Sequence, residues 1–368
     1  MKKLYLHVGV GKTGSTAIQH ALSVSKRRLR KHGYLYPTSL GVGHAKMAQV
    51  FRSDEAVLRS PFFRKQTVHE TPAELRASTL AEFSEEVASS SAESIVVVNE
   101  TLFSLPEDQF DEMLRFFKGV FNDITLIFFV RRQDEMIVSS FKQGIIQGAT
   151  NTLDQFVRYS TQKATDKSPP NHLDYASFLD RVSDRHPDIT LRTALYNKTM
   201  FEKKSLLDTF ATLIDLPEAV LYSEKGGVRN KSLDAACAEY LRLYNASLEG
   251  ELAPAILIRC LKKLSSKQDY VLSSKAREAI FSRFRDGNLR VATVYLKQGG
   301  ELLAAPMSQE PSSGQVTEAP DIESLHFKVI GQLCKEHEKQ VTERKTAWGR
   351  FAQVEKQLES LKSKARQS

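Results

Sequence analysis

The sequence has little of what secreted, membrane-spanning or metal-stabilised proteins are built from. Its three cysteines, Cys237, Cys260 and Cys334, form no CxxC pair and no metal-ligand spacing, which argues against a disulfide scaffold or a metal site and favours a reducing compartment. The longest apolar run, Ile124–Val130, has seven residues, whereas a membrane helix requires about 20. The first apolar run ends at Lys12, which is too short for a signal peptide. We therefore expect a cytoplasmic protein without a transmembrane segment.

Charge of both signs is present, with a basic excess that is unevenly placed. The 368 residues include 52 Lys and Arg against 44 Asp and Glu, which gives a net charge of +8. Residues 1–60 contain eleven basic and two acidic side chains, and residues 323–368 contain ten basic and six acidic ones. This balance favours an anionic ligand. Nucleic acid is not expected, because no basic patch interleaved with aromatic residues is present.

Apolar segments of strand length alternate with segments of helical periodicity. The expected strands are 4–10, 95–98, 124–130 and 189–195. The expected helices are one that ends before Gly33, followed by 72–90, 107–118, 203–214, 232–245, 253–265 and 274–288. Because the strands are almost uninterruptedly apolar, the pattern predicts an α/β fold whose parallel sheet is covered by helices on both faces.

The last part of the chain differs in composition. We expect an α/β domain over 1–296, a linker rich in Gly, Pro and Ser over 297–322, and an amphipathic C-terminal helix over 323–368. The heptad pattern in that helix lapses at Arg344 and Glu355, which indicates a short partner helix or a weak coiled coil. Self-association through 323–368 is therefore one expected interaction.

The turn after the first strand has the composition of an anion cradle. Gly11 and Gly14 allow a close approach of the backbone, Lys12 adds a positive charge, and the start of the following helix favours negative charge. The loop also supplies three hydroxyl groups, those of Thr13, Ser15 and Thr16. The alternative interpretation is an ordinary tight turn between a strand and a helix.

This turn does not match the P-loop motif GxxxxGK[ST] completely. The motif requires a glycine at position 6, where this chain has Leu6. P-loop enzymes also use an Asp after a buried strand to help hold Mg²⁺, whereas the strands here are followed by Asn99-Glu100 and Arg131-Arg132. A P-loop-type small-molecule kinase is therefore an alternative that lacks the first glycine of the motif and the Mg²⁺-binding Asp.

Arg131 is better explained as another anion contact. It follows a buried strand, and Ser139 lies eight residues further on in a predicted helix, so a guanidinium fork and a hydroxyl can hold one phosphate together. Ligands of such sheets bind at the carboxyl ends of the strands, where both Arg131 and the glycine loop are expected. The alternative is a solvated arginine pair followed by a helix serine.

These residues resemble the PAPS-dependent sulfotransferases, in particular their bacterial carbohydrate-type branch. Residues 12–16 (KTGST) look like the 5′-phosphosulfate loop of that family, and the stretch from Arg131 to Ser139 looks like its 3′-phosphate motif. A softer similarity lies at Arg229-Asn230-Lys231-Ser232. The resemblance covers about residues 3–296.

The resemblance implies a P-loop nucleotide-kinase-like fold and a function. Such an enzyme moves a sulfuryl group from PAPS to an acceptor hydroxyl or amine, here on a carbohydrate or glycolipid, and requires no metal. The implied donor-binding residues are Lys12, Thr13, Gly14, Ser15, Thr16, Arg131, Ser139 and Arg229. Lys12 would also act in catalysis, by stabilising the leaving phosphate.

In-line transfer to a hydroxyl benefits from a general base. Glu100 follows the strand 95–98, resembles the glutamate base of heparan-type members and is the first candidate; the alternative interpretation is a charge at a helix start. His44 is the other candidate, in an expected flexible loop after the first helix. A non-catalytic scaffold that uses the C-terminal helix is the remaining functional alternative.

Overall fold

The computed structural model describes most of the chain. The described residues are 2–60, 62–63, 71–162, 172–197, 205–221, 232–248, 252–266, 269–297, 303, 322–335 and 337–343. The chain divides into two compact units, the first made of Met1–Ser140, Thr152–Arg229 and Leu272–Gln309, the second of Phe141–Asn151, Asn230–Val271 and Glu310–Ser368. Among the described helices, none has the length and hydropathy needed to cross a bilayer.

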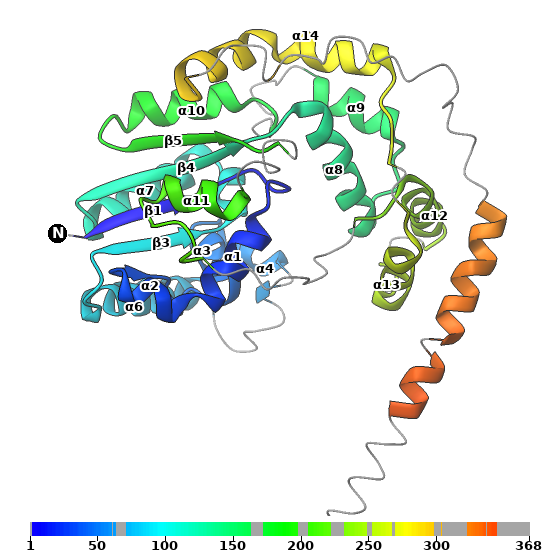
Figure 1. Cartoon of the computed structure of the whole chain (residues 1–368), viewed down its shortest axis with the longest axis horizontal. Coiled ribbons are helices and arrows are strands. Elements are labelled where there is room, and N and C mark those ends of the chain that lie inside the picture. Colours follow the sequence, from blue (N-terminus) through cyan, green and yellow to red (C-terminus); the bar gives the residue numbers. More distant parts are fainter. Residues whose placement is uncertain are drawn as a thin grey trace, which may run out of the picture. The chain divides into compact units, whose positions relative to one another are not determined.

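The first unit contains a five-stranded sheet in which all strands are parallel (Figure 1). Its order is β2-β3-β1-β4-β5, with bounds Lys3–His7 for β1, Tyr34–Leu35 for β2, Ser94–Val98 for β3, Asp123–Val130 for β4 and Thr190–Leu195 for β5. In the central strand, Leu4 pairs with Ile95 on one side and with Ile124 on the other. The predicted α/β fold with a covered parallel sheet is confirmed.

Alternate residues of the central strands face two separate hydrophobic clusters. Leu4 and Leu6 point to one face, while Tyr5 points to the other. The second face is covered by α1 (Ser15–Val24), α2 (Lys26–Lys31) and α11 (Leu206–Leu213). The first is covered by α3 (Ala45–Val50), α6 (Pro72–Ser89), α7 (Glu107–Val120), α9 (Leu153–Thr161), α10 (Tyr175–Arg185) and α14 (Ser274–Arg290).

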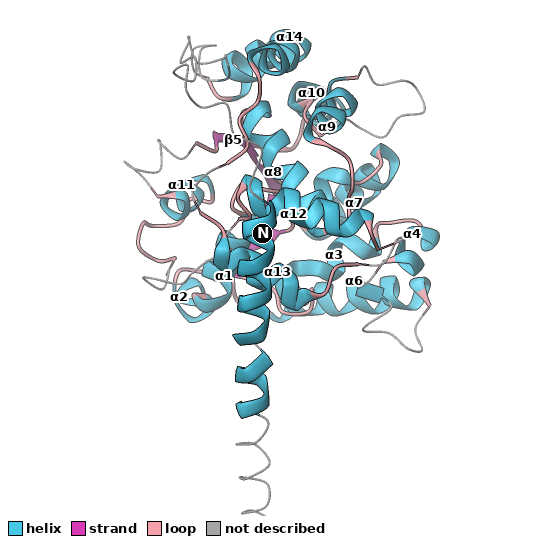
Figure 2. Cartoon of the chain, turned by 90° about the vertical axis from the view of Figure 1, so that its right-hand side faces the viewer, coloured by secondary structure: helices cyan, strands magenta, loops and turns pink. Residues whose placement is uncertain are grey.

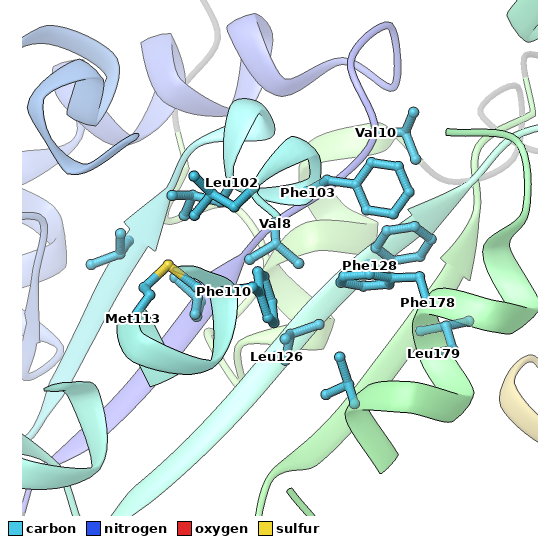
Figure 3. Packing of buried hydrophobic residues seen from close by; sticks show 14 of the residues in the cluster. Val8, Val10, Leu102, Phe103, Phe110, Met113, Leu126, Phe128, Phe178 and Leu179 are labelled. Atoms are coloured by element: carbon cyan, nitrogen blue, oxygen red, sulfur yellow. The ribbon is translucent and has the colours of Figure 1, made fainter. Parts of the chain in front are cut away.

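The larger cluster contains a group of contacting aromatic side chains near the carboxyl end of β4. Phe128 of β4 stacks on Phe178 of α10 with ring centroids 5.1 Å apart, and Phe103 meets Phe178 edge-on at 4.7 Å (Figure 3). Burial of one such side chain contributes about 1.5–3 kcal/mol. The packing therefore fixes the carboxyl end of β4, where Arg131 follows.

Several elements differ from the sequence-based expectation, and three of the differences concern the sheet and the helix after its first strand. The first strand ends at His7 rather than at residue 10, because the chain leaves the sheet after Val8 to form the glycine loop. Strand β2 has only two residues and was not predicted. The first helix is interrupted at Ser25, whose backbone (φ −94°, ψ 5°) leaves the helical region between α1 and α2.

The short remaining elements of this unit are α4 (Asp54–Arg59), the 3₁₀ helices η1 (Val42–His44) and η2 (Glu100–Ser104), and the π-helix η4 (Val291–Tyr295). Helix α8 (Gln133–Ile146) belongs to this unit up to Ser140 and to the second unit from Phe141. Among these, η2 matters for the site because it begins at Glu100, directly after β3.

The second unit is helical in its described part (Figure 2). It contains α12 (Ala235–Ala246), α13 (Ala255–Leu264) and a helix over 322–335 and 337–343. Asn245 of α12 donates its side-chain amide to the carbonyl oxygens of Ile145 and Ala149, at 2.7 and 3.2 Å. These bonds attach α12 to the last turn of α8 and to the turn that follows it, within the same unit.

Candidate functional site

The carboxyl ends of four strands bring the predicted site residues to one edge of the sheet. The loop 8–14 follows β1, Asn99 follows β3, Arg131 follows β4 and Tyr196 follows β5. The crossover after β1 runs over the face covered by α1, whereas the crossover after β4 runs over the opposite face through α10. The boundary between β1 and β4 is therefore a topological switch point, where parallel α/β sheets bind ligands.

The loop after β1 is tightly folded. Lys12 and Gly14 have left-handed backbones, with φ of 71° and 82°. The buried Thr13 hydroxyl donates to the carbonyl oxygen of Val10 at 2.6 Å, so this hydroxyl closes the loop. A Cβ added to Gly14 would overlap the side chain of Leu206 and lie 3.2 Å from Cε2 of Tyr196. Glycine is thus required at position 14 both for its backbone and for the space around it.

The start of α1 has no side-chain cap. Gly14 is its N-cap residue and offers no side-chain oxygen. Eight other described helices are capped by a side chain, from Ser53, Thr71, Asn99, Thr152, Asp174, Ser205, Asp234 and Ser273. No side chain therefore competes with a ligand for the first N–H groups of α1, the groups that bind anions at helix N-termini. In this first turn, Ser15 is buried and Thr16 is exposed.

Arg131 connects the end of β4 to this loop. Its guanidinium donates to the carbonyl oxygen of Lys12 at 2.9 Å and, through Nε, to Glu135 at 3.2 Å. It also lies 5.3 Å from the ring centre of Tyr196, within range of a cation–π contact. The Tyr175 hydroxyl donates to the Arg131 carbonyl oxygen at 2.9 Å. The structure therefore brings Arg131 together with the glycine loop, as expected from the strand ends.

Ser139 lies on α8, two helical turns from Arg131, and is half-buried. Glu135 lies one turn before Ser139 on the same face of α8, whereas Arg131 precedes the helix, which begins at Gln133. A carboxylate thus stands between the two residues predicted to hold a phosphate, and it forms an ion pair with Arg131. Glu135 was not predicted from the sequence, although an acidic side chain four residues after an arginine is a recognisable signal for an ion pair.

Glu100 is hydrogen-bonded to a side chain of α1. Its Oε2 accepts a hydrogen bond of 3.0 Å from Nε2 of Gln19, which lies one helical turn after Ser15. The same Gln19 nitrogen lies 3.3 Å from the carbonyl oxygen of Gly43. Glu100 is half-buried. Its carboxylate is therefore held beside the helix whose first turn forms the cradle. The role of Gln19 was not foreseen.

Tyr36 is a further member of this region that sequence reasoning missed. It directly follows β2, it is 5% exposed, and its hydroxyl has no hydrogen-bond partner. Burial, and to a lesser extent the charge of Glu100, raises the pKa of this hydroxyl. An unpaired buried hydroxyl therefore lies within electrostatic reach of the candidate base. No sequence signal distinguishes it from an ordinary core tyrosine.

His44 has a different environment from the one expected. It ends η1 and is fully buried, with its ring stacked on Tyr36 at 4.2 Å. The backbone N–H of Val98 donates to Nδ1 at 3.1 Å, so Nε2 carries the proton and donates to the carbonyl oxygen of Pro37, also at 3.1 Å. Burial lowers its pKa to about 3. The expectation of a flexible loop is wrong, and this geometry favours Glu100 over His44 as the base.

His7 lies under the glycine loop. It is fully buried, and neither ring nitrogen has a hydrogen-bond partner. The ring meets Phe129 and Phe210 edge-on, with centroids 5.6 and 5.8 Å away. Burial lowers its pKa to about 3, so it is neutral. His7 belongs to the core rather than to the reacting groups.

A surface hollow of about 670 Å³ lies elsewhere, between α7 and α10. Its lining residues are Glu107, Asp108, Asp111, Arg115, Arg185 and His186. Most of these charges already pair with one another, as in Arg185–Asp111 at 2.8 Å and His186–Asp111 at 3.0 Å. We therefore interpret the hollow as an ion-paired helix interface.

One predicted donor-binding residue cannot be placed in the structure. Arg229 lies outside the described residues. Within the described ranges, no group of three or more His, Cys, Asp or Glu side chains is arranged to hold a metal ion.

Comparison with protein-family models, with curated proteins and with solved structures gave no match. The resemblance to sulfotransferases thus rests on the residues named above.

Proposed function

We propose that this protein is a sulfotransferase that moves a sulfuryl group from PAPS to an acceptor on a carbohydrate or glycolipid. The observation that carries the proposal is the 2.9 Å hydrogen bond from Arg131 to the carbonyl oxygen of Lys12. It joins the two segments that the resemblance assigns to the two phosphate-bearing ends of PAPS. The proposal includes a nucleotide-kinase-like arrangement of the sheet and a cytoplasmic location.

In this proposal the glycine loop binds the 5′-phosphosulfate. Lys12 and the N–H groups at the start of α1 supply positive charge, and Ser15 and Thr16 supply hydroxyls. The 3′-phosphate is assigned to Arg131 and Ser139, and Arg229 adds a further contact. Gly14 keeps the backbone close to the ligand. Thr13 acts mainly by closing the loop, since its hydroxyl is bound to Val10.

The reaction is a single in-line displacement. Glu100 takes the proton from the acceptor hydroxyl, whose oxygen forms a bond to sulfur while the bond from sulfur to the bridging oxygen of the 5′-phosphate breaks. The electron pair remains on the leaving phosphate, where Lys12 and the loop N–H groups stabilise the developing charge. Gln19 orients the carboxylate through its hydrogen bond to Glu100.

Ligand-induced thermal stabilisation tests the proposal. We expect PAP, the adenosine bisphosphate product, to stabilise the wild type without added magnesium, by about 2.7 kcal/mol at a hundredfold excess over its Kd. Lys12→Ala should lose most of this shift. A larger shift with Mg-ATP than with PAP would instead support a small-molecule kinase, which the same measurement thereby separates from a sulfotransferase.

Transfer of labelled sulfate from PAPS to a panel of glycans tests the catalytic roles. Glu100→Gln should lower transfer at least a hundredfold while the PAP-induced shift remains, because a general base contributes roughly 10²–10⁴ in rate. Glu112→Gln on the exposed side of α7 is the matched control and should leave transfer unchanged. Unchanged transfer in Glu100→Gln would remove the base assignment and leave the proposed reaction standing.

A further inference from the structure

The helix near the end of the chain has apolar side chains on two sides. It is described over 322–335 and 337–343 and belongs to the second unit. One side is covered within that unit. Val329 is 1% exposed, and Leu325 and Leu333 are half-buried. The Tyr240 hydroxyl of α12 lies 2.8 Å from Nδ1 of His326, which attaches this side of the helix to its own unit.

The other side is bare. Phe327 is 68% exposed, Ile330 44% and Val341 37%, and Cys334 is exposed as well. At 100° per residue these four side chains fall within about 60° of one another on the helix surface. Their spacing of three, four and seven residues is that of the a and d positions of a heptad, with exposed His337 at the remaining d position.

Several features point to a second copy of the same helix as the occupant. The bare stripe is narrow, as in a two-stranded coiled-coil seam, rather than a broad apolar face. The flanking e and g positions are Gly331, Leu333, Glu338 and Gln340, of which only Glu338 carries a full charge. No row of like charges therefore repels an identical helix in register. In the sequence the heptad spacing lapses at the d position Arg344 and resumes at Trp348 and Phe351.

We infer that this helix pairs with the same helix of a second chain, parallel and in register, through Phe327, Ile330, Cys334 and Val341. Each a residue then meets its own copy, so the Cys334 thiols of the two chains lie next to each other. This inference is independent of the proposed sulfotransferase activity. It assigns the pairing surface, its orientation and its register.

Light scattering on the full-length protein tests the pairing. At about 100 μM we expect a mass twice the 41.4 kDa of one chain. Phe327→Glu and Ile330→Glu should each weaken the dimer at least tenfold, while Lys328→Glu on the polar side should not. Because Phe327 is largely exposed, its substitution should leave the melting temperature of the monomer fold unchanged. A monomeric wild type, or a dimer that survives Phe327→Glu, would overturn the inference.

Oxidative cross-linking tests the register. Cys334 is the exposed cysteine of the chain, whereas Cys237 and Cys260 are buried. Oxygen with copper–phenanthroline oxidises two facing thiols to a disulfide, so we expect a covalent dimer within minutes. Cys334→Ser should abolish the cross-link and keep the non-covalent dimer. A dimer that fails to cross-link through Cys334 would refute the parallel register.

Discussion

Tyr34 and Tyr36 lie two residues apart and face the same hydrophobic cluster, but their hydroxyl groups differ. The Tyr34 hydroxyl donates to the carbonyl oxygens of Ile214 and Asp215, at 2.8 and 3.0 Å. The Tyr36 hydroxyl has no partner. A buried donor without a partner loses its hydration and gains nothing in exchange. The pair therefore allows the same substitution to be compared in two environments.

We expect Tyr34→Phe to lower the free energy of unfolding by about 1–3 kcal/mol, because it removes a bonded hydroxyl. Tyr36→Phe should leave the free energy unchanged or raise it slightly. Urea unfolding at pH 7 measures both. A loss of stability equal to that of Tyr34→Phe would show that the Tyr36 hydroxyl is bonded after all.

The residues of the candidate site were predictable to different degrees. Lys12 and Arg131 could be expected near each other, because both follow parallel strands that end at one edge of the sheet. The contact of Gln19 with Glu100 was not predictable, because it depends on how α1 lies over the sheet, whereas the spacing of four residues could have indicated the Arg131–Glu135 pair. The environment of His44 was not predictable either. Its ring bonds to Pro37, seven residues earlier, and to Val98, 54 residues later.

At the scale of elements, the junction between the glycine loop and α1 is the most constrained part of the site. Gly14→Ala should strain the left-handed backbone and force Leu206 aside. We expect a loss of about 1–3 kcal/mol in the free energy of unfolding and loss of PAP binding. Denaturant unfolding and the thermal shift measure the two effects.

Gly33→Ala is the matched control for that substitution. Gly33 also has a positive φ, of 77°, but a Cβ there meets no atom within 4 Å. It should lose only the strain energy and should bind PAP as the wild type does. Normal PAP binding by Gly14→Ala would contradict the role assigned to this loop.

The length and burial of a strand explain whether it was predictable. β3 has five residues and β4 has eight, and all but the first residue of each are buried, so their apolar runs stand out in the sequence. β2 has two residues, Tyr34 and Leu35, and exists only because they pair with Ser94 and Ile95. No periodic pattern can be read from two residues. The interruption at Ser25 was likewise hidden, since the apolar pattern continues through it.

At the scale of the whole molecule, two fully buried neutral histidines make the fold sensitive to acid. Burial lowers the pKa of His7 and of His44 from 6.5 to about 3. Between these values the unfolded chain binds a proton at each site and the folded chain does not. Stability is therefore lost as the pH falls from 6.5 towards 3, by up to about 1.4 kcal/mol per pH unit for each histidine. We expect cooperative unfolding within this range, measured by circular dichroism.

Single substitutions measure how much each histidine contributes to the loss of stability in acid. His7→Phe removes two unpaired ring nitrogens among aromatic neighbours, so it should lower the pH midpoint of unfolding and preserve or raise stability at pH 7. His44→Phe also removes a titrating group, but it breaks two hydrogen bonds and should destabilise the protein at pH 7. An unchanged acid midpoint in His7→Phe would contradict the assigned cause.

The position of β1 in the middle of the sheet has a consequence for synthesis. Leu4 is translated before both of its partners, since Ile95 and Ile124 follow it by about 90 and 120 residues. At roughly 5–20 residues per second, the apolar first strand waits several seconds or more for either neighbour. During that interval its apolar side chains are exposed, and the hydrogen bond from Arg131 to the Lys12 carbonyl oxygen cannot form until β4 has been made. The glycine loop of the candidate site is thus translated well before the strand that completes the site.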